Sequence, residues 1–88
     1  MVKLMKVKVL YFASLREAVG CASEDLDVPA EVHTLGALRA FLAARGEGWK
    51  ALGVGRNVRA ALNQRMSGAE AALAAGDEVA FFPPVTGG

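Results

Sequence analysis

The last six residues of the sequence carry the groups that best suggest chemistry: Pro83, Pro84, Val85, Thr86, Gly87 and Gly88. Two prolines after an apolar run stop sheet pairing, because a proline has no N–H to donate, and they favour an extended backbone. Glycines lack a Cβ and can thread a channel too narrow for other residues. We therefore expect a projecting tail of residues 83–88 that carries the Gly88 carboxylate into a partner's active site, and a separate domain of residues 1–82.

A terminal carboxylate becomes reactive only after activation. It is a poor electrophile at neutral pH, so we expect it to be converted to an acyl-adenylate, from which a sulfur donor displaces AMP. The product is a thiocarboxylate, whose soft, ionised sulfur is a competent nucleophile. The sequence shows no obvious acid, base or oxyanion hole for these steps. We expect partners to supply them, with ATP used by an activating enzyme and no cofactor bound by the chain itself.

Cys21 is the only cysteine and His33 the only histidine. An internal disulfide is impossible, which favours a reduced, cytoplasmic setting, and no zinc set or other metal site is expected. Cys21 could carry a persulfide, but a free cysteine is more often a small buried apolar residue, and we favour that interpretation. His33 is expected at the surface, beside a helix start.

The composition indicates a protein-binding surface. Hydrophobic residues make up 53% of the chain and charged residues 22%, with a mean hydropathy of +0.31. That is more apolar surface than a small core hides comfortably, so part of it is expected to face another protein. The net charge of +1, with ten basic residues scattered among nine acidic ones, gives no reason to expect nucleic acid or a membrane surface as a partner.

Periodicity predicts a small α+β domain. Residues 6–12 alternate as a strand, with Val7, Val9 and Tyr11 on one face and Lys6, Lys8, Leu10 and Phe12 on the other, outward face. A short helix over 14–19 is expected, capped by Ser14 with Glu17 in a capping box and ended by Gly20. A short strand is expected over 24–28.

The second half is expected to supply the main helix and two further strands. Thr34 precedes a helix over 35–45 that Gly46 ends, and the glycine-rich residues 46–55 indicate a loop. Val58, Ala60 and Leu62 face inward on a strand that turns at Asn63-Gln64, and a turn at Gly76-Asp77 starts the last strand, 78–82. The helix should lie across one face of a small mixed sheet. If Val79 and Phe81 point at it, Ala80 and Phe82 point away, and Phe12 and Phe82 are outward aromatics.

Residues 76–88, Gly-Asp-Glu-Val-Ala-Phe-Phe-Pro-Pro-Val-Thr-Gly-Gly, resemble the C-terminal signature of the molybdopterin synthase small-subunit family. Residues 9–13, 15–17 and 60–64 and the helix opening at Thr34 resemble that family in order and spacing. The resemblance covers nearly the whole chain from Met5, with Met1–Leu4 as an extra piece. A final Gly-Gly is a weak signal alone, but the run from Phe81 to Gly88 is specific.

The resemblance implies a ubiquitin-like β-grasp fold and a sulfur-carrier role. In that role an adenylyltransferase related to ubiquitin-activating enzymes adenylates Gly88, and a sulfurtransferase makes the thiocarboxylate. The carrier then docks on the synthase large subunit, in a heterotetramer, and donates sulfur to cyclic pyranopterin monophosphate. The family's apolar contact with the large subunit falls on Phe12, Met66 and Phe82, and the catalytic groups are expected on the large subunit.

Three other functions remain open at this point. The chain could carry sulfur for thiamin or another thiolated product. It could be a protein modifier that forms isopeptide bonds with lysines. It could also be a plain interaction module that works through its outer sheet face, with a functionless terminus.

Overall fold

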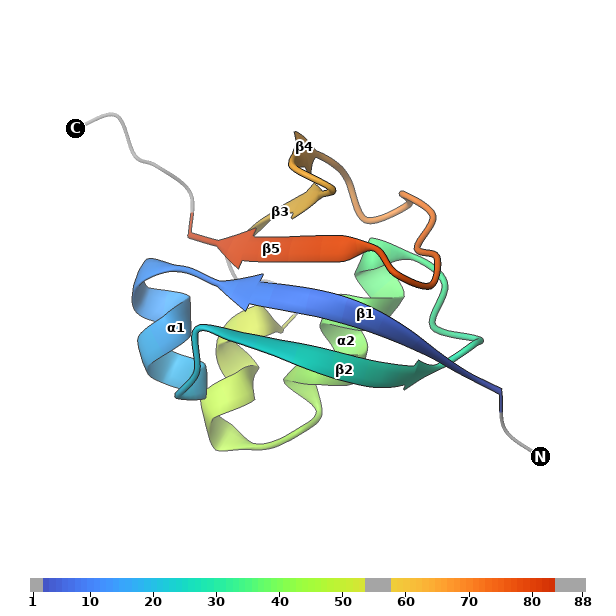
Figure 1. The fold of residues 1–88 in the computed structure, drawn as a ribbon. Helices are drawn as coiled ribbons and strands as arrows, with labels where there is room; N and C mark the ends of the chain where they lie inside the picture. Colours follow the sequence, from blue (N-terminus) through green and yellow to red (C-terminus); the bar gives the residue numbers. More distant parts are fainter. Residues whose placement is uncertain (1–2, 54–57, 84–88) are drawn as a thin grey trace.

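A computed structural model gives the structure of residues 3–53 and 58–83, which form a five-stranded sheet with helices on one face (Figure 1). The strands lie in the order β2-β1-β5-β3-β4. In chain order the elements are β1 (Leu4–Tyr11), α1 (Ala13–Val19), β2 (Ser23–Pro29), α2 (Leu35–Ala43), the 3₁₀ helix η1 (Glu47–Leu52), β3 (Arg59–Leu62), β4 (Arg65–Met66) and β5 (Glu78–Phe82). This is the predicted α+β architecture.

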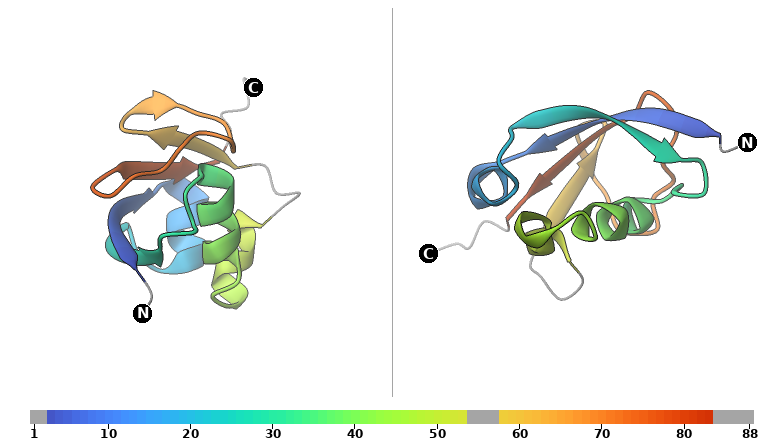
Figure 2. Two further views of the ribbon diagram at one scale, coloured as in Figure 1. Left: turned by 90° about the vertical axis from the view of Figure 1, so that its right-hand side faces the viewer. Right: turned by 90° about the horizontal axis from the view of Figure 1, so that it is seen from below.

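The sheet is mixed, with β1 and β5 as a parallel pair at its centre. Their register places Tyr11 beside Phe81. β2 runs antiparallel to β1, and β3 runs antiparallel to β5 and to β4. The second view in Figure 2 shows α2 lying under one face of this sheet. No helix formed by the described residues covers the opposite face.

The core lies between the sheet and α2, as the alternation predicts. Val7, Val9 and Tyr11 of β1 are buried, as are Val79 and Phe81 of β5. Three leucines of α2 meet them: Leu35, Leu38 and Leu42. The inward faces of both central strands are therefore confirmed.

The main helix begins as predicted but ends earlier. Thr34 Oγ1 accepts a hydrogen bond from the Ala37 N–H at 3.1 Å, which is an N-cap contact. The helix ends at Ala43, and Arg45 lies beyond it. The Arg45 guanidinium lies 4.1 Å above the Trp49 ring and donates to Glu24 Oε2 at 2.9 Å. These contacts draw Arg45 towards η1 and β2 instead of along the helix axis.

The predicted loop at residues 46–55 is wrong for its described part, because residues 47–52 form η1. Leu52 is fully buried, and the Trp49 ring meets the Tyr11 ring edge-on at 5.5 Å. Two large apolar side chains inside a glycine-rich stretch anchor this turn to the core. Residues 54–57 lie outside the described part.

The predicted cap of the first helix is also wrong. α1 begins at Ala13, its N-cap residue is Phe12, and no side-chain cap bond is made. Because the helix follows β1 directly, Ser14 is already helical and cannot adopt the extended backbone of an N-cap residue. The predicted end is confirmed, since Gly20 adopts a left-handed φ of 85°.

Both predicted turns are present. Asn63 and Gln64 have φ of 50° and 69°, as a tight hairpin turn requires, and this turn creates the short strand β4. The Asn63 amide donates to Asp77 Oδ1 at 3.1 Å and accepts from the Glu78 N–H at 3.0 Å. The two turns are thus fastened to each other. Among the described residues, no helix is both long and apolar enough to span a membrane.

Candidate functional site: an apolar patch where the tail begins

The outward sheet face carries a row of apolar side chains across four strands. Residues paired directly across neighbouring strands point to the same face. Leu10 pairs with Ala80, Ala80 with Ala61, and Ala61 with Met66. Because Tyr11 and Phe81 point inward and are buried, this row points outward.

Phe12 and Phe82 extend the row at the ends of the central strands. The Phe12 N–H donates to the Phe81 carbonyl at 3.1 Å, which keeps Phe12 in line with β5. Phe12 is 48% exposed and Met66 61% exposed, whereas Phe82 is half-buried. We call this surface the outward patch; it comprises Leu10, Phe12, Ala61, Met66, Ala80 and Phe82.

The three residues predicted for a partner interface all belong to the outward patch. The predicted outward direction of Phe12 and Phe82 is confirmed. The sequence argument did not name Ala61, although the inward direction of Ala60 and Leu62 implies that Ala61 points outward; its place between Ala80 and Met66 follows from the strand pairing. That a partner covers these residues stays a prediction.

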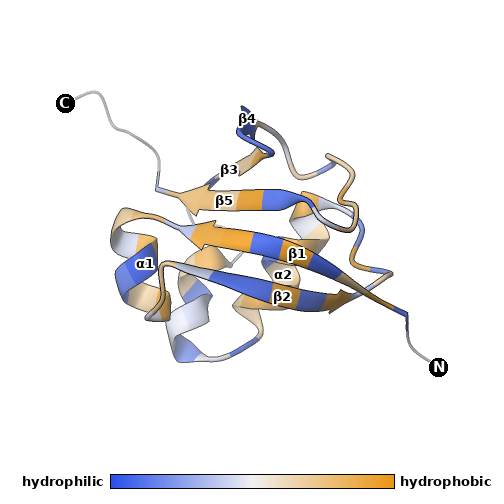
Figure 3. Ribbon diagram, in the orientation of Figure 1, coloured by the Kyte–Doolittle hydropathy of each residue, from blue (hydrophilic) through white to orange (hydrophobic). Residues whose placement is uncertain are grey.

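The other end of the same face is charged. Lys8 pairs with Asp25 on one side and with Glu78 on the other, and Lys6 pairs with Asp27. Figure 3 shows the change along β5, from hydrophilic at its start to hydrophobic at its arrowhead. A partner that needs apolar contact therefore finds it at the end of the face where β1 and β5 finish.

The predicted tail begins at this apolar end. β5 ends at Phe82, and Pro83, which follows it, is half-buried. Pro84, Val85, Thr86, Gly87 and Gly88 lie outside the described residues, so their roles stay predictions. What the structure places is the start of the tail, next to the outward patch.

Tyr11 supports the patch from beneath. Its ring stacks on that of Phe81 with centroids 6.4 Å apart, and its hydroxyl donates to Glu24 Oε2 at 2.9 Å. Burial, followed by the hydrogen bond to Glu24, raises the pKa of Tyr11 above its usual value. The neutral phenol is thus a fixed part of the core, packed against Phe81 where the two central strands end.

Cys21 and His33 show no features of a reactive site. The Cys21 side chain is half-buried against the core, and burial raises the pKa of its thiol, with Glu24 adding to the effect. A raised pKa lowers the thiolate fraction, which argues against a persulfide carrier. His33 is exposed, with Nδ1 2.8 Å from the Glu31 carbonyl. In the described ranges no three acidic, histidine or cysteine side chains gather as a metal site.

Known proteins resemble this chain along almost its entire length. The ThiS family model matches residues 9–88. The molybdopterin synthase sulfur carrier subunit of Escherichia coli is 44% identical, over 93% of this chain and 99% of its own length. The protein of the same name from Haemophilus influenzae is 42% identical, over 93% of this chain and 99% of its own length.

Solved structures agree in fold. SAMP1 of Haloferax volcanii has a TM-score of 0.77 at 28% identity, over 94% of this chain and 99% of its own. A complex of subunits 1 and 2 of the Helicobacter pylori molybdopterin-converting factor contains a chain with a TM-score of 0.62 at 32% identity. The match covers 96% of this chain and 100% of that chain. A ubiquitin of Caldiarchaeum subterraneum has a TM-score of 0.54 at 19% identity, over 98% of this chain and 100% of its own. This similarity shows the fold alone, which is the predicted ubiquitin-like β-grasp. With its family model matched over residues 9–88, the chain belongs to the ThiS family, and its curated relatives are molybdopterin synthase sulfur carrier subunits.

Proposed function

We propose that this chain is the sulfur-carrier subunit of a molybdopterin synthase. Its similarity to carrier subunits over nearly its full length supports the class of function. The observation that supports the proposal most is the outward patch at the end of β5, because this exposed apolar surface lies beside the start of the segment that leads to Gly87-Gly88.

In the proposed reaction Gly88 is a substrate that becomes a reagent. An adenylyltransferase related to ubiquitin-activating enzymes joins the Gly88 carboxylate to AMP, taken from ATP with release of pyrophosphate. A sulfurtransferase system then provides the sulfur that displaces AMP, leaving a thiocarboxylate. Its sulfur attacks cyclic pyranopterin monophosphate and displaces an oxygen substituent, which gives a thioester between Gly88 and the substrate. Water then cleaves the bond between the Gly88 carbonyl and the sulfur, so that the sulfur stays on the substrate and the carrier leaves with its carboxylate restored; two carriers are used for each dithiolene. The chemistry takes place in the cytoplasm, where ATP and reduced sulfur donors are available.

The large subunit of the synthase is the proposed docking partner. The Helicobacter pylori relative in complex with its subunit 2 supports this partner. Phe12, Met66 and Phe82 would form the buried centre of the contact, as exposed apolar side chains commonly do. Catalytic acid, base and anion-stabilising groups belong to the large subunit in this proposal, which we expect to assemble as a heterotetramer.

A one-residue extension tests the tail mechanism. Adding an alanine after Gly88 removes the glycine carboxylate from the position that the activating enzyme reaches, while the outward patch is unchanged. We expect sulfur transfer to be lost and binding to the large subunit to remain. Retained sulfur transfer would contradict the proposal, and loss of both activities would point to a folding defect, which the thermal unfolding temperature would reveal.

A protein modifier is the second candidate, supported by the similarity to SAMP1, whose name describes a small archaeal modifier protein. The same activated Gly88 would then be attacked by a lysine amine instead of a sulfur donor. Mass spectrometry of tryptic peptides from cells tests this. Gly88 in amide linkage to lysines would establish the modifier role, and its absence under conditions that give thiocarboxylate would exclude it there.

A further inference from the structure

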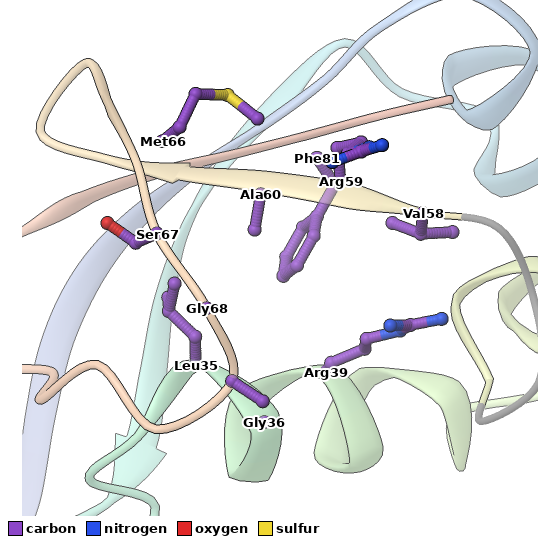
Figure 4. Close-up of a pocket in the computed structure, with 11 residues that line it drawn as sticks. Leu35, Gly36, Arg39, Val58, Arg59, Ala60, Met66, Ser67, Gly68 and Phe81 are labelled. Atoms are coloured by element: carbon purple, nitrogen blue, oxygen red, sulfur yellow. The ribbon is translucent and has the colours of Figure 1, made fainter. Parts of the chain in front are cut away.

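A groove lies along the edge of the sheet, between β3 and α2 (Figure 4). Its volume is about 420 Å³, which lies within the usual range of ligand pockets. Leu35, Ala60 and Phe81 form an apolar floor. Figure 4 shows Ala60 and Phe81 pointing from the sheet towards α2, on the face opposite to the outward patch. We call this cavity the edge groove.

The edge groove runs beside a stretch of β3 whose outer flank is open. The β3–β4 ladder ends at the pair Ala61–Met66, and one further bond joins the Ser67 N–H to the Ala60 carbonyl at 3.1 Å. Beyond it the chain turns down to α2, where the Gly36 N–H donates to the Ala69 carbonyl at 2.8 Å. Among the described residues no strand continues the sheet beside Val58–Arg59. A short strand edge next to an apolar groove suits an added extended peptide.

The two ends of the edge groove differ in charge. Among the described residues, Arg39 is the charged side chain on the groove's own face, because Arg59 pairs with Phe82 and points to the outward face. Arg39 is held at the end towards Val58 by donating to the Leu52 and Gly53 carbonyls, the latter at 2.8 Å. The carboxylate of Glu70 lies against Gly68 at the other end. A bound segment would therefore place an acidic side chain at the arginine end.

Met66 connects the edge groove to the outward patch, because it lines the groove and also points to the outward face. A partner that covers the patch up to Met66 has reached the rim of the groove. We propose that the edge groove binds an extended segment of the synthase large subunit, which lies beside β3 with apolar side chains over Ala60 and an acidic side chain near Arg39. This inference rests on the proposed function, since it takes its partner from there.

The test compares leucine substitutions of two alanines. Ala60→Leu fills the edge groove, whereas Ala40→Leu adds the same side chain at an exposed position of α2 that belongs to neither the groove nor the outward patch. Hydrogen–deuterium exchange of residues 58–60 is measured in the full chain, with and without the purified large subunit, together with the affinity of each variant.

We expect the large subunit to slow exchange at residues 58–60 in the wild-type chain and in Ala40→Leu. In Ala60→Leu this slowing should be lost, and affinity should fall about tenfold. If the wild-type complex forms but exchange at residues 58–60 is unchanged, binding in the edge groove is contradicted and the proposed function is not. If no complex forms with the wild-type chain, both are contradicted.

Arg39→Gln tests the charge without filling the groove. Because Arg39 also donates to the Leu52 and Gly53 carbonyls, the thermal unfolding temperature of this variant is measured to confirm the fold. Arg65→Gln is the matched control, since Arg65 is exposed and does not line the groove. We expect the first variant to reduce both affinity and the slowing of exchange, and the second to leave both within about twofold of wild type. Equal effects of the two variants would contradict the acidic segment.

Discussion

Individual side chains of the outward patch differ in what they can reveal about docking. Met66 is 61% exposed and contributes little to the core, so it can be changed without harming the fold. Phe82 is half-buried, and its substitution would mix folding with binding. The most informative residue-scale tests therefore use exposed members of the patch and an exposed apolar residue outside it.

Met66→Asp should weaken binding to the large subunit by about 2 kcal/mol, roughly 30-fold in Kd, because it puts a carboxylate into an apolar contact. Leu4→Asp is the matched control, since Leu4 is 55% exposed at the charged end of the same face. Isothermal titration calorimetry measures both variants. A Kd for Met66→Asp equal to that of Leu4→Asp would mean that the large subunit binds elsewhere.

Tyr11 should make the stability of the fold fall in alkali. Its pKa is raised above the ordinary value of 10.0 in the folded chain, so between the two values the folded state holds a proton that the unfolded state has lost. The stabilisation is therefore complete below about pH 10 and decreases as the pH rises further. Urea unfolding at a series of alkaline pH values should show a shallower decline for Tyr11→Phe than for wild type. Parallel declines would refute this role.

At the scale of elements, α1, α2 and η1 form a layer whose spacing depends on one close contact. A Cβ built on Gly48 would lie 2.4 Å from the Ala18 carbonyl oxygen, so η1 and α1 meet backbone to backbone. Trp49 and Leu52 are the adjacent core anchors. The first turn of η1 therefore tolerates no side chain at this position.

Gly48→Ala should destabilise the fold by about 1–3 kcal/mol, because backbone must move to admit the new methyl group. Gly68→Ala is a matched control. There the new methyl group meets the end of the Glu70 side chain, which can rotate away at little cost. Chemical denaturation of the two variants compares them directly, and equal stabilities would show that η1 is not packed against α1 as described.

The sequence predicted the elements whose pattern is periodic and missed those fixed by packing. The alternation of Val7, Val9 and Tyr11 defined both faces of β1, and with them the outward direction of Phe12. η1 could not be predicted, since glycines interrupt any period and Leu52 becomes a core residue only through tertiary contact. The α1 cap failed because Ser14 fits the motif but follows a strand that leads directly into the helix.

The residues of the candidate site also differ in whether the sequence pattern could predict them. Phe82 followed from strand parity, but Met66 was reached by resemblance, since its direction depends on the turn at Asn63-Gln64 and the resulting pairing with Ala61. The edge groove was not predicted at all. Its floor joins Leu35, Ala60 and Phe81, which are far apart in sequence and meet only when α2 packs under β3 and β5.

At the scale of the whole molecule, one face is divided between charge and apolar surface, and the tail begins on the apolar side. In the proposed function, part of the high apolar content of this small chain serves docking instead of the core. Docking by the outward patch would then fix where β5 ends, and six extended residues can span roughly 20 Å from there. In this proposal the body positions the tail, and the tail carries the sulfur.

The intact mass of the chain tests the central claim most directly. The protein is incubated with its adenylyltransferase, a sulfurtransferase, ATP and a sulfur source, and is then measured by mass spectrometry with fragmentation of the C-terminal peptide. We expect the mass gain of one sulfur replacing one oxygen, located at Gly88 and absent when ATP is omitted. An unchanged mass under conditions in which a known carrier subunit is converted would contradict the account.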